Sequence, residues 1–275
     1  MAEKNGAEKD GIVTGRIDCA SGGTAYFARP ETSGSYPCVV LFHERYGLVQ
    51  HTLDLVDRFA GDGFVAVAPD LFFRHPDIAA VNRGDARCDV TDPQVADDAE
   101  AAIEALSGIE GADTDKLFAM GVCQSGRWPL VLAARRTLSA CLVFYGAASD
   151  REWQVNEEYP EALEELMGRI ECPVLGIFGE ADHVIPIEGV LKFRDVLERH
   201  RKSFQIHIYP DMPHGWLNDT MPGRYRRDAA EMAWAELMAF CADVMDGNFP
   251  PGRVLWEFTA DCGTGYDFAS NVRLA

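Results

Sequence analysis

Short runs of apolar residues recur along the chain, and most of them are not interrupted by polar residues. Strands that are covered on both faces of a sheet show this pattern, because neither face meets water. We therefore predict strands at residues 38–43, 64–69, 116–122, 141–146, 172–179 and 204–210. Ahead of them, two β-forming segments, "IVTGRID" and "TAYFARP", flank the Gly-rich sequence "CASGG" and predict an antiparallel hairpin.

The segments between these strands repeat their apolar residues with the period of a helix. Predicted helices lie at residues 48–63, 91–108, 127–136, 187–200 and 224–245. Thr91 precedes Asp92 and Pro93 and is expected to cap the second of them. Strands that alternate with helices predict an α/β fold, with a mainly parallel sheet, helices on both of its faces and right-handed crossovers.

The length and composition suit one large core, because the chain has 275 residues and 47% of them are hydrophobic. We expect one domain over residues 1–246, followed by an extension over residues 247–275 that contains a further strand at 253–258. Four aromatic residues of the extension favour its burial, either on the domain or at a subunit interface, so that the protein is a monomer or a homodimer. They are Trp256, Phe258, Tyr266 and Phe268.

Charge and cysteine usage exclude several classes of protein. A net charge of −19 argues against nucleic acid as a partner, since phosphate binding needs a positive surface. The first twenty residues do not resemble a signal peptide, and no apolar run is long enough to span a membrane. The eight cysteines are scattered without a CxxC pair, which is typical of reduced thiols. We therefore expect a cytoplasmic protein that does not bind membranes.

The sequence "GVCQSG" at residues 121–126 places a thiol and a hydroxyl two residues apart between a predicted strand and a predicted helix. A nucleophile in such a strand-to-helix turn needs small residues two positions before and after it. Cys123 meets this rule through Gly121 and Ser125, whereas Ser125 has Cys123 and Arg127 at those positions. The motif favours Cys123 as a nucleophile; the alternative is an ordinary buried cysteine at a strand end.

An acid and a histidine follow Cys123 in the order that this type of active site uses. Asp182 lies just beyond the predicted strand 172–179, and His214 lies in a loop after the strand 204–210. A turn aspartate and a surface histidine are the alternatives. Glu180 and Asp211 are weaker candidates for the acid, and His183, next to Asp182, is expected to point away from that acid and to be a bystander.

Five segments, "VLFHERYGL", "GFVAVAPDLFFR", "GVCQSG", "GEADHVIP" and "PHGW", resemble the dienelactone hydrolase family of α/β-hydrolases, which is carboxymethylenebutenolidase-like. The resemblance covers about residues 12–245. It implies an α/β-hydrolase fold and hydrolysis of a small-molecule ester or lactone through a triad of Cys123, His214 and Asp182. The intermediate would be an acyl-thioester, and no metal or cofactor is implied.

The resemblance also implies roles for the residues around the thiol. Glu44 would exchange hydrogen bonds with Cys123, and the backbone N–H groups of Gln124 and Arg45 would form the oxyanion hole. The sequence departs from the family at Ser125, where glycine is usual, and at Asn218, where members that process dienelactones carry arginine.

Further residues are candidates for binding the substrate. Four cations could meet an anionic group or simply be solvated, and a tyrosine follows a strand: Arg74, Arg83, Arg87, Arg127 and Tyr145. The pair His43–Glu44 lacks the HExxH pattern of zinc enzymes. Two functions of other classes stay open, a redox-sensing thiol protein and a non-catalytic binding protein on the same fold.

Overall fold

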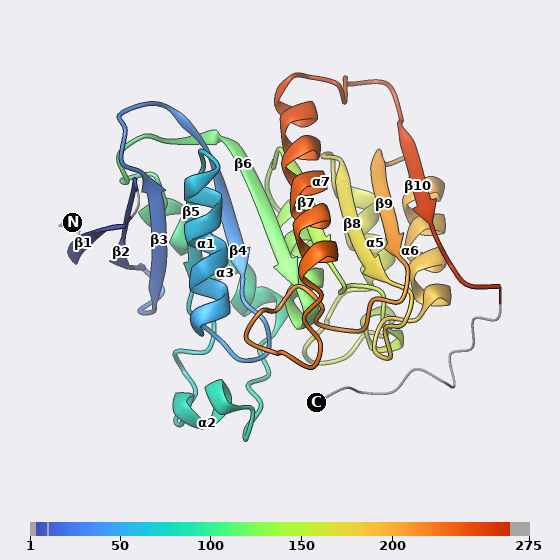
Figure 1. Ribbon diagram of the computed structural model, residues 1–275, viewed down its shortest axis with the longest axis horizontal. Helices are drawn as coiled ribbons and strands as arrows, with labels where there is room; N and C mark the ends of the chain where they lie inside the picture. The colour runs from blue at the N-terminus through green and yellow to red at the C-terminus, as the bar shows by residue number, and fades with distance from the viewer. Residues whose placement is uncertain (1–3, 10, 265–275) are drawn as a thin grey trace. The chain divides into compact units, whose positions relative to one another are not determined.

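Figure 1 shows the computed structural model, which describes residues 4–9 and 11–264. The chain forms two compact units, Met1–Met120 and Gly121–Ala275. Each unit contains strands and helices, which alternate along much of the chain as the sequence patterns predict.

The strands of the first unit follow the order β1-β2-β3-β5-β4-β6. Their bounds are Lys4–Lys9 for β1, Ile12–Asp18 for β2, Thr24–Pro30 for β3, Tyr36–Phe42 for β4, Val65–Pro69 for β5 and Ala112–Val122 for β6. The predicted hairpin is confirmed, because β2 and β3 pair antiparallel. β4 and β5 pair parallel. β1 was not predicted, and it pairs antiparallel with β2.

Three helices belong to this unit: α1 (Gln50–Gly61), α2 (Ile78–Arg83) and α3 (Asp92–Leu106). In Figure 1, α1 lies in front of β3 and β5 and α3 lies behind them, so the sheet is covered on both faces. The predicted cap of α3 is confirmed: the Thr91 side chain accepts from the Gln94 N–H, and the Gln94 side chain accepts from the Thr91 N–H. This reciprocal pair satisfies two N–H groups that the helix start leaves without partners.

The second unit holds four parallel strands in the order β7-β8-β9-β10. Their bounds are Ala140–Phe144, Val174–Gly179, Phe204–Tyr209 and Trp256–Ala260. Every residue of β7 and β8 is buried, which explains why these strands read as unbroken apolar runs. Parallel strands end at the same edge of a sheet, and the loops after β7, β8 and β9 therefore meet there.

Four helices accompany these strands: α4 (Trp128–Ala133), α5 (Leu163–Arg169), α6 (Ile187–Arg199) and α7 (Arg227–Met245). Figure 1 shows α7 in front of β7 and β8, with α5 and α6 behind the sheet. The helix predicted at 127–136 is shorter than expected: it begins after a 3₁₀ turn over Cys123–Arg127 and ends at Ala133. A second 3₁₀ turn covers Asp150–Trp153.

The C-terminal extension adds β10 to the edge of this sheet, beside β9 (Figure 1). The strand runs slightly later than predicted. Trp256 stacks on Phe204 with ring centroids 6.3 Å apart, yet 53% of its surface stays exposed. The expected burial is therefore only partial for this residue, and Tyr266 and Phe268 lie outside the described residues.

No helix in the described part of the chain is both long and apolar enough to cross a membrane.

Candidate active site

The turn after β6 forces the backbone of Cys123 into the left-handed region, with a φ of 59°. L-residues other than glycine rarely adopt this conformation, and it recurs at functional sites. Gly121 makes the turn possible. A Cβ at this position would lie 2.1 Å from the carbonyl oxygen of Ser125 and 2.8 Å from Cδ of Pro129. Any larger residue at position 121 would therefore push the turn open.

Ser125 closes the same turn with its side chain. Its hydroxyl accepts a hydrogen bond from the Val122 N–H at 2.8 Å and donates one to the Val122 carbonyl oxygen at 2.9 Å. The residue is fully buried. The hydroxyl thus pairs with both polar groups of one backbone residue, and this explains a serine where the resembled family has glycine.

The end of β7 packs directly against the turn. A Cβ on Gly126 would lie 2.6 Å from Cα of Gly146, and a Cβ on Gly146 would lie 2.4 Å from the Cys123 carbonyl oxygen. This close backbone approach places Tyr145, which has a φ of 35° and is buried, next to the histidine loop. Its ring meets the ring of His214 edge to face at 5.3 Å.

Cys123, His214 and Asp182 form one chain of hydrogen bonds. The Cys123 Sγ lies 3.0 Å from Nε2 of His214, and the opposite ring nitrogen, Nδ1, lies 2.8 Å from Oδ2 of Asp182. Asp182 is fully buried and His214 is 5% exposed. The other carboxylate oxygen of Asp182 accepts from the N–H groups of Val184 and Ile185, at 2.7 and 2.9 Å. The loop after β8 therefore fixes the carboxylate, and the carboxylate orients the imidazole.

The charges on either side of His214 shift its titration. Burial by itself lowers the pKa of His214, since it disfavours the charged form. The negative charges of Cys123 and Asp182, together with the hydrogen bonds to them, outweigh burial and raise the pKa of His214 well above its usual value. These surroundings therefore favour the protonated form of His214.

His183, which was expected to point away from Asp182 and to be a bystander, lies beside His214. Its ring meets the ring of His214 edge to face, with centroids 5.9 Å apart. Trp216 was not predicted at all; it is fully buried and its ring lies 6.1 Å from that of Tyr145. Both placements depend on how the loops after β8 and β9 fold back, which no residue pattern in the sequence signals.

Arg127 is held by backbone carbonyl groups of the loop that follows β7. Its guanidinium donates to the carbonyl oxygens of Glu152 at 3.0 Å and Glu161 at 2.6 Å, and it lies 4.6 Å from the ring centre of Tyr159. The side chain is fully buried. Arg127 thus holds residues 152–161 in place. Its role is structural, and it is not a solvated cation.

In the first unit, His43 fixes the backbone around Glu44. Its Nδ1–H donates to the Glu44 carbonyl oxygen at 2.9 Å, and its Nε2 accepts from the Leu71 N–H at 3.1 Å. Burial lowers the pKa of His43, so the ring is neutral in this tautomer. Glu44 itself is buried, with 5% exposure, and the Arg45 side chain donates to the Gly84 carbonyl oxygen at 3.4 Å.

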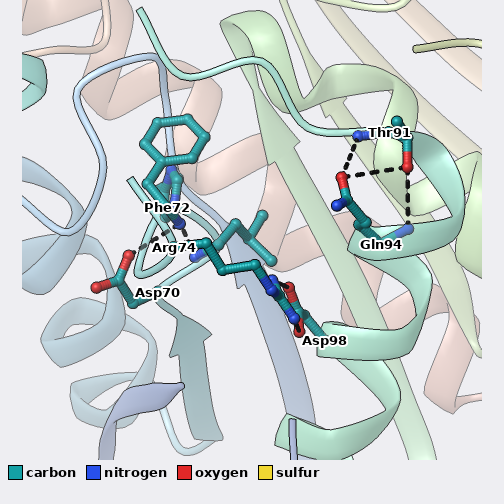
Figure 2. Close-up of polar contacts among 8 residues, drawn as sticks. Asp70, Phe72, Arg74, Thr91, Gln94 and Asp98 are labelled. Carbon is teal, nitrogen blue, oxygen red and sulfur yellow. Dashed lines mark hydrogen bonds and ion pairs between the residues drawn. The ribbon is translucent and has the colours of Figure 1, made fainter. Parts of the chain in front are cut away.

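The other three candidate cations lie in this unit and pair with acids. Figure 2 shows Arg74 in a two-pronged contact with Asp98, at 2.6 and 2.9 Å, beside the Thr91–Gln94 cap and the Asp70–Phe72 hydrogen bond. Arg83 lies 2.9 Å from Asp85, and Arg87 lies 3.8 Å from Asp89, both exposed. Exposed pairs of this kind are weak, about 0–1 kcal/mol. Arg74 is the most firmly engaged of the three, because Asp98 is buried.

Within residues 4–9 and 11–264, no group of three or more His, Cys, Asp or Glu side chains is arranged to hold a metal ion.

Comparison with known proteins identifies the family of the chain. The sequence model of the dienelactone hydrolase family matches residues 24–245. A protein of Escherichia coli named "Putative carboxymethylenebutenolidase" is 30% identical over 240 residues, which cover 83% of this chain and 86% of that protein. A "Probable 2-oxo-3-(5-oxofuran-2-ylidene)propanoate lactonase" of Bradyrhizobium is 25% identical over 219 residues, covering 78% of this chain and 87% of that one.

Among solved structures, a "Putative Dienelactone Hydrolase" from Klebsiella pneumoniae superposes with a TM-score of 0.75 at 27% identity. The match covers 84% of this chain and 98% of that one. The family match spans most of the chain and includes all three members of the hydrogen-bonded chain. The protein therefore belongs to the dienelactone hydrolase family and is an ester or lactone hydrolase with an α/β-hydrolase fold.

Proposed function

We propose that the protein hydrolyses a small-molecule ester or lactone with Cys123 as nucleophile, His214 as general base and acid, and Asp182 as the group that orients His214. One observation carries the proposal: the Cys123 thiol, His214 and Asp182 are joined at 3.0 and 2.8 Å. A thiol attacks as thiolate, and a neighbouring imidazole that accepts its proton meets that need.

The reaction runs in two halves. Nε2 of His214 takes the Cys123 proton, and the thiolate forms a C–S bond with the ester carbonyl carbon. The tetrahedral oxyanion collapses, the alkoxide leaves with the proton held by His214, and an acyl-thioester remains. In the second half His214 removes a proton from water, the hydroxide displaces the thiolate, and the carboxylic acid is released.

The oxyanion would be stabilised by two backbone N–H groups, those of Gln124 and Arg45. Gln124 follows the nucleophile in the 3₁₀ turn, where N–H groups at the start of a helical segment have no partner within it. Arg45 is assigned through the family. Loss of one such donor typically raises the barrier by about 2.7–4 kcal/mol.

Glu44 is proposed as a second carboxylate that acts on the thiol. A negative charge near Cys123 opposes formation of the thiolate and slows its oxidation in the free enzyme. Glu44→Gln should therefore make alkylation of Cys123 by iodoacetamide faster at neutral pH, while an unchanged rate would remove Glu44 from this role.

We propose a lactone without a free carboxylate as the substrate, because the position that would bind a dienelactone's carboxylate carries no arginine. Asn218, at the position of the substrate-binding arginine, is 1% exposed, and its Oδ1 accepts from the N–H and the hydroxyl of Thr220 at 3.0 and 2.6 Å. The Bradyrhizobium relative is, by its name, a lactonase that acts on a propanoate, so it supports lactone hydrolysis but not the lack of a carboxylate. Tyr145, against His214, is the proposed apolar wall for the acyl group.

Turnover of p-nitrophenyl acetate by two matched variants tests the assignment of the nucleophile. Cys123→Ala should lose at least about 10³-fold in kcat/KM, since removal of a nucleophile leaves only the oxyanion hole and binding. Ser125→Ala should keep most of the activity and lose about 1 kcal/mol of stability, because its hydroxyl forms hydrogen bonds with the backbone of Val122. Full activity in Cys123→Ala would remove the thiol from its role as nucleophile. Without ester turnover in the wild type, peroxide consumption by Cys123 would favour the redox-sensing alternative, and its absence would favour the binding protein.

A further inference from the structure

Glu180 joins three segments of the second unit through one carboxylate. It follows β8 directly, two residues before Asp182, and only 6% of it is exposed. Its Oε2 accepts from the N–H of Asp211 at 2.9 Å, and its Oε1 accepts from the N–H of Gly263 at 2.5 Å. The first hydrogen bond reaches the loop that carries His214, and the second reaches the C-terminal extension.

The loop that carries His214 rests on the segment that carries Asp182. The Ala181 N–H donates to the Met212 carbonyl oxygen at 3.1 Å, and a Cβ on Gly179 would lie 2.3 Å from that same oxygen. Asp211 has a φ of 58°, a costly conformation for a residue with a side chain. A strained residue stays in place only when its surroundings hold it there, and the hydrogen bond from the Asp211 N–H to Glu180 does so.

The C-terminal extension reaches Glu180 because its strand, β10, pairs with β9. Residues Trp256–Ala260 run parallel to β9 (Figure 1). The chain therefore leaves β10 at the same edge of the sheet as the segments that follow β8 and β9, which carry Glu180 and His214. At the start of β10 the Trp256 Nε1–H donates to the Lys202 carbonyl oxygen at 2.9 Å, and further along the guanidinium of Arg194 lies 4.9 Å from the ring centre of Phe258. The family match ends at residue 245, so these interactions belong to an addition to the family fold.

We propose that residues 255–264 form a support for the active site and that Glu180 is a positioning residue. Its hydrogen bonds with Gly263 and Asp211 connect this support to the loop that carries His214. A carboxylate that accepts two N–H groups is held more firmly than one that accepts a single N–H, because bonds to charged acceptors are strong. Without the hydrogen bond from the Gly263 N–H, Glu180 is less fixed, and the Asp211 backbone and His214, three residues further, shift out of alignment with Cys123. This inference rests on the proposed function of Cys123, His214 and Asp182.

Two substitutions of Gly263 distinguish the effect of losing its N–H from the effect of adding a side chain. Gly263→Ala keeps the N–H; its Cβ would lie 3.5 Å from Oε1 of Glu180, at an ordinary van der Waals distance. Gly263→Pro removes the N–H and with it the bond. We expect Gly263→Pro to lower kcat for p-nitrophenyl acetate about 3–10-fold with a smaller change in KM, and Gly263→Ala to match the wild type.

The pH profile of Cys123 alkylation by iodoacetamide supplies a readout that needs no ester turnover. If His214 is less well aligned, alkylation near neutral pH should slow about 3–10-fold in Gly263→Pro and in Glu180→Gln, but not in Gly263→Ala. If both Gly263 variants had the same alkylation profile and the same kcat, the proposed supporting role of residues 255–264 would be wrong. Absence of ester turnover in the wild type with the alkylation pattern intact would instead count against the proposed function alone.

Discussion

His214 lies between two acidic groups, and each of its ring nitrogens faces one of them, Sγ of Cys123 at 3.0 Å and Oδ2 of Asp182 at 2.8 Å. Burial at this position disfavours the imidazolium, yet the pKa of His214 is raised because the two negative charges act at hydrogen-bond distance. A raised pKa in the folded protein adds stability that is present in full below the unfolded value, about 6.5. That contribution is lost as the pH rises through the folded value.

Removal of the Cys123 thiol should lower the pKa of His214, because the charge of Cys123 is the largest contribution that raises it. In Cys123→Ala the imidazole should therefore lose its proton at lower pH than in the wild type, and the pH range in which His214 stabilises the fold should narrow on its alkaline side. The titration of the His214 ring protons by NMR measures this directly. Identical midpoints in the two proteins would mean that the thiol carries no charge beside His214.

The residues that lie together at the candidate site could be predicted because the rules that select them are local. Small neighbours allow the turn at Cys123 and exclude Ser125, and the loops after two late strands leave few choices for the acid and the histidine. The hydrogen bonds of Arg127 with the carbonyl groups of Glu152 and Glu161 could not be predicted, since they depend on the fold of a loop without a regular pattern.

At the scale of elements, the site depends on how tightly β6 turns into the following helix. The turn places the Ser125 carbonyl oxygen against Gly121, and Gly126 and Gly146 allow β7 to approach to backbone contact. Fully buried strands such as β8 were predicted almost to their ends, because continuous apolar residues mark them. Short elements such as β1, α2 and α5 were missed, since six or seven residues show too little of a period.

Gly121→Ala tests the geometry of the turn. An added Cβ would lie 2.1 Å from a backbone oxygen that cannot move without the turn. Overpacking of this kind costs about 1–3 kcal/mol, which lowers Tm by roughly 2–4 °C per kcal/mol in a chain of this size. Ester hydrolysis should fall as well, since Cys123 shifts with the turn.

Gly61→Ala is the matched control, because a Cβ at Gly61 meets no atom within 4 Å and the residue ends α1. It should leave Tm and activity unchanged. If Gly121→Ala behaved like Gly61→Ala in both measurements, the tight turn would not be a requirement of the site.

Over the whole molecule, the cysteines differ sharply in their surroundings. Burial raises the pKa of Cys38 and Cys241 to about 12 and that of Cys19 to about 11, and it raises that of Cys141 well above the usual value. Cys88 and Cys262 are more accessible, yet partial burial and then nearby carboxylates raise the pKa of each. These thiols are poor nucleophiles at neutral pH, whereas Cys123 has a histidine at hydrogen-bond distance.

The acyl-thioester is the species that distinguishes this account from others, and mass spectrometry can locate it. The protein is mixed with p-nitrophenyl acetate, quenched in acid within the first turnover and digested. We expect one acetyl group on the peptide that contains Cys123, assigned to the cysteine by fragmentation, and none on the peptides of the other seven cysteines. Turnover with the acetyl group on Ser125, or with no acetyl group on Cys123 at any quench time, would contradict the thiol mechanism.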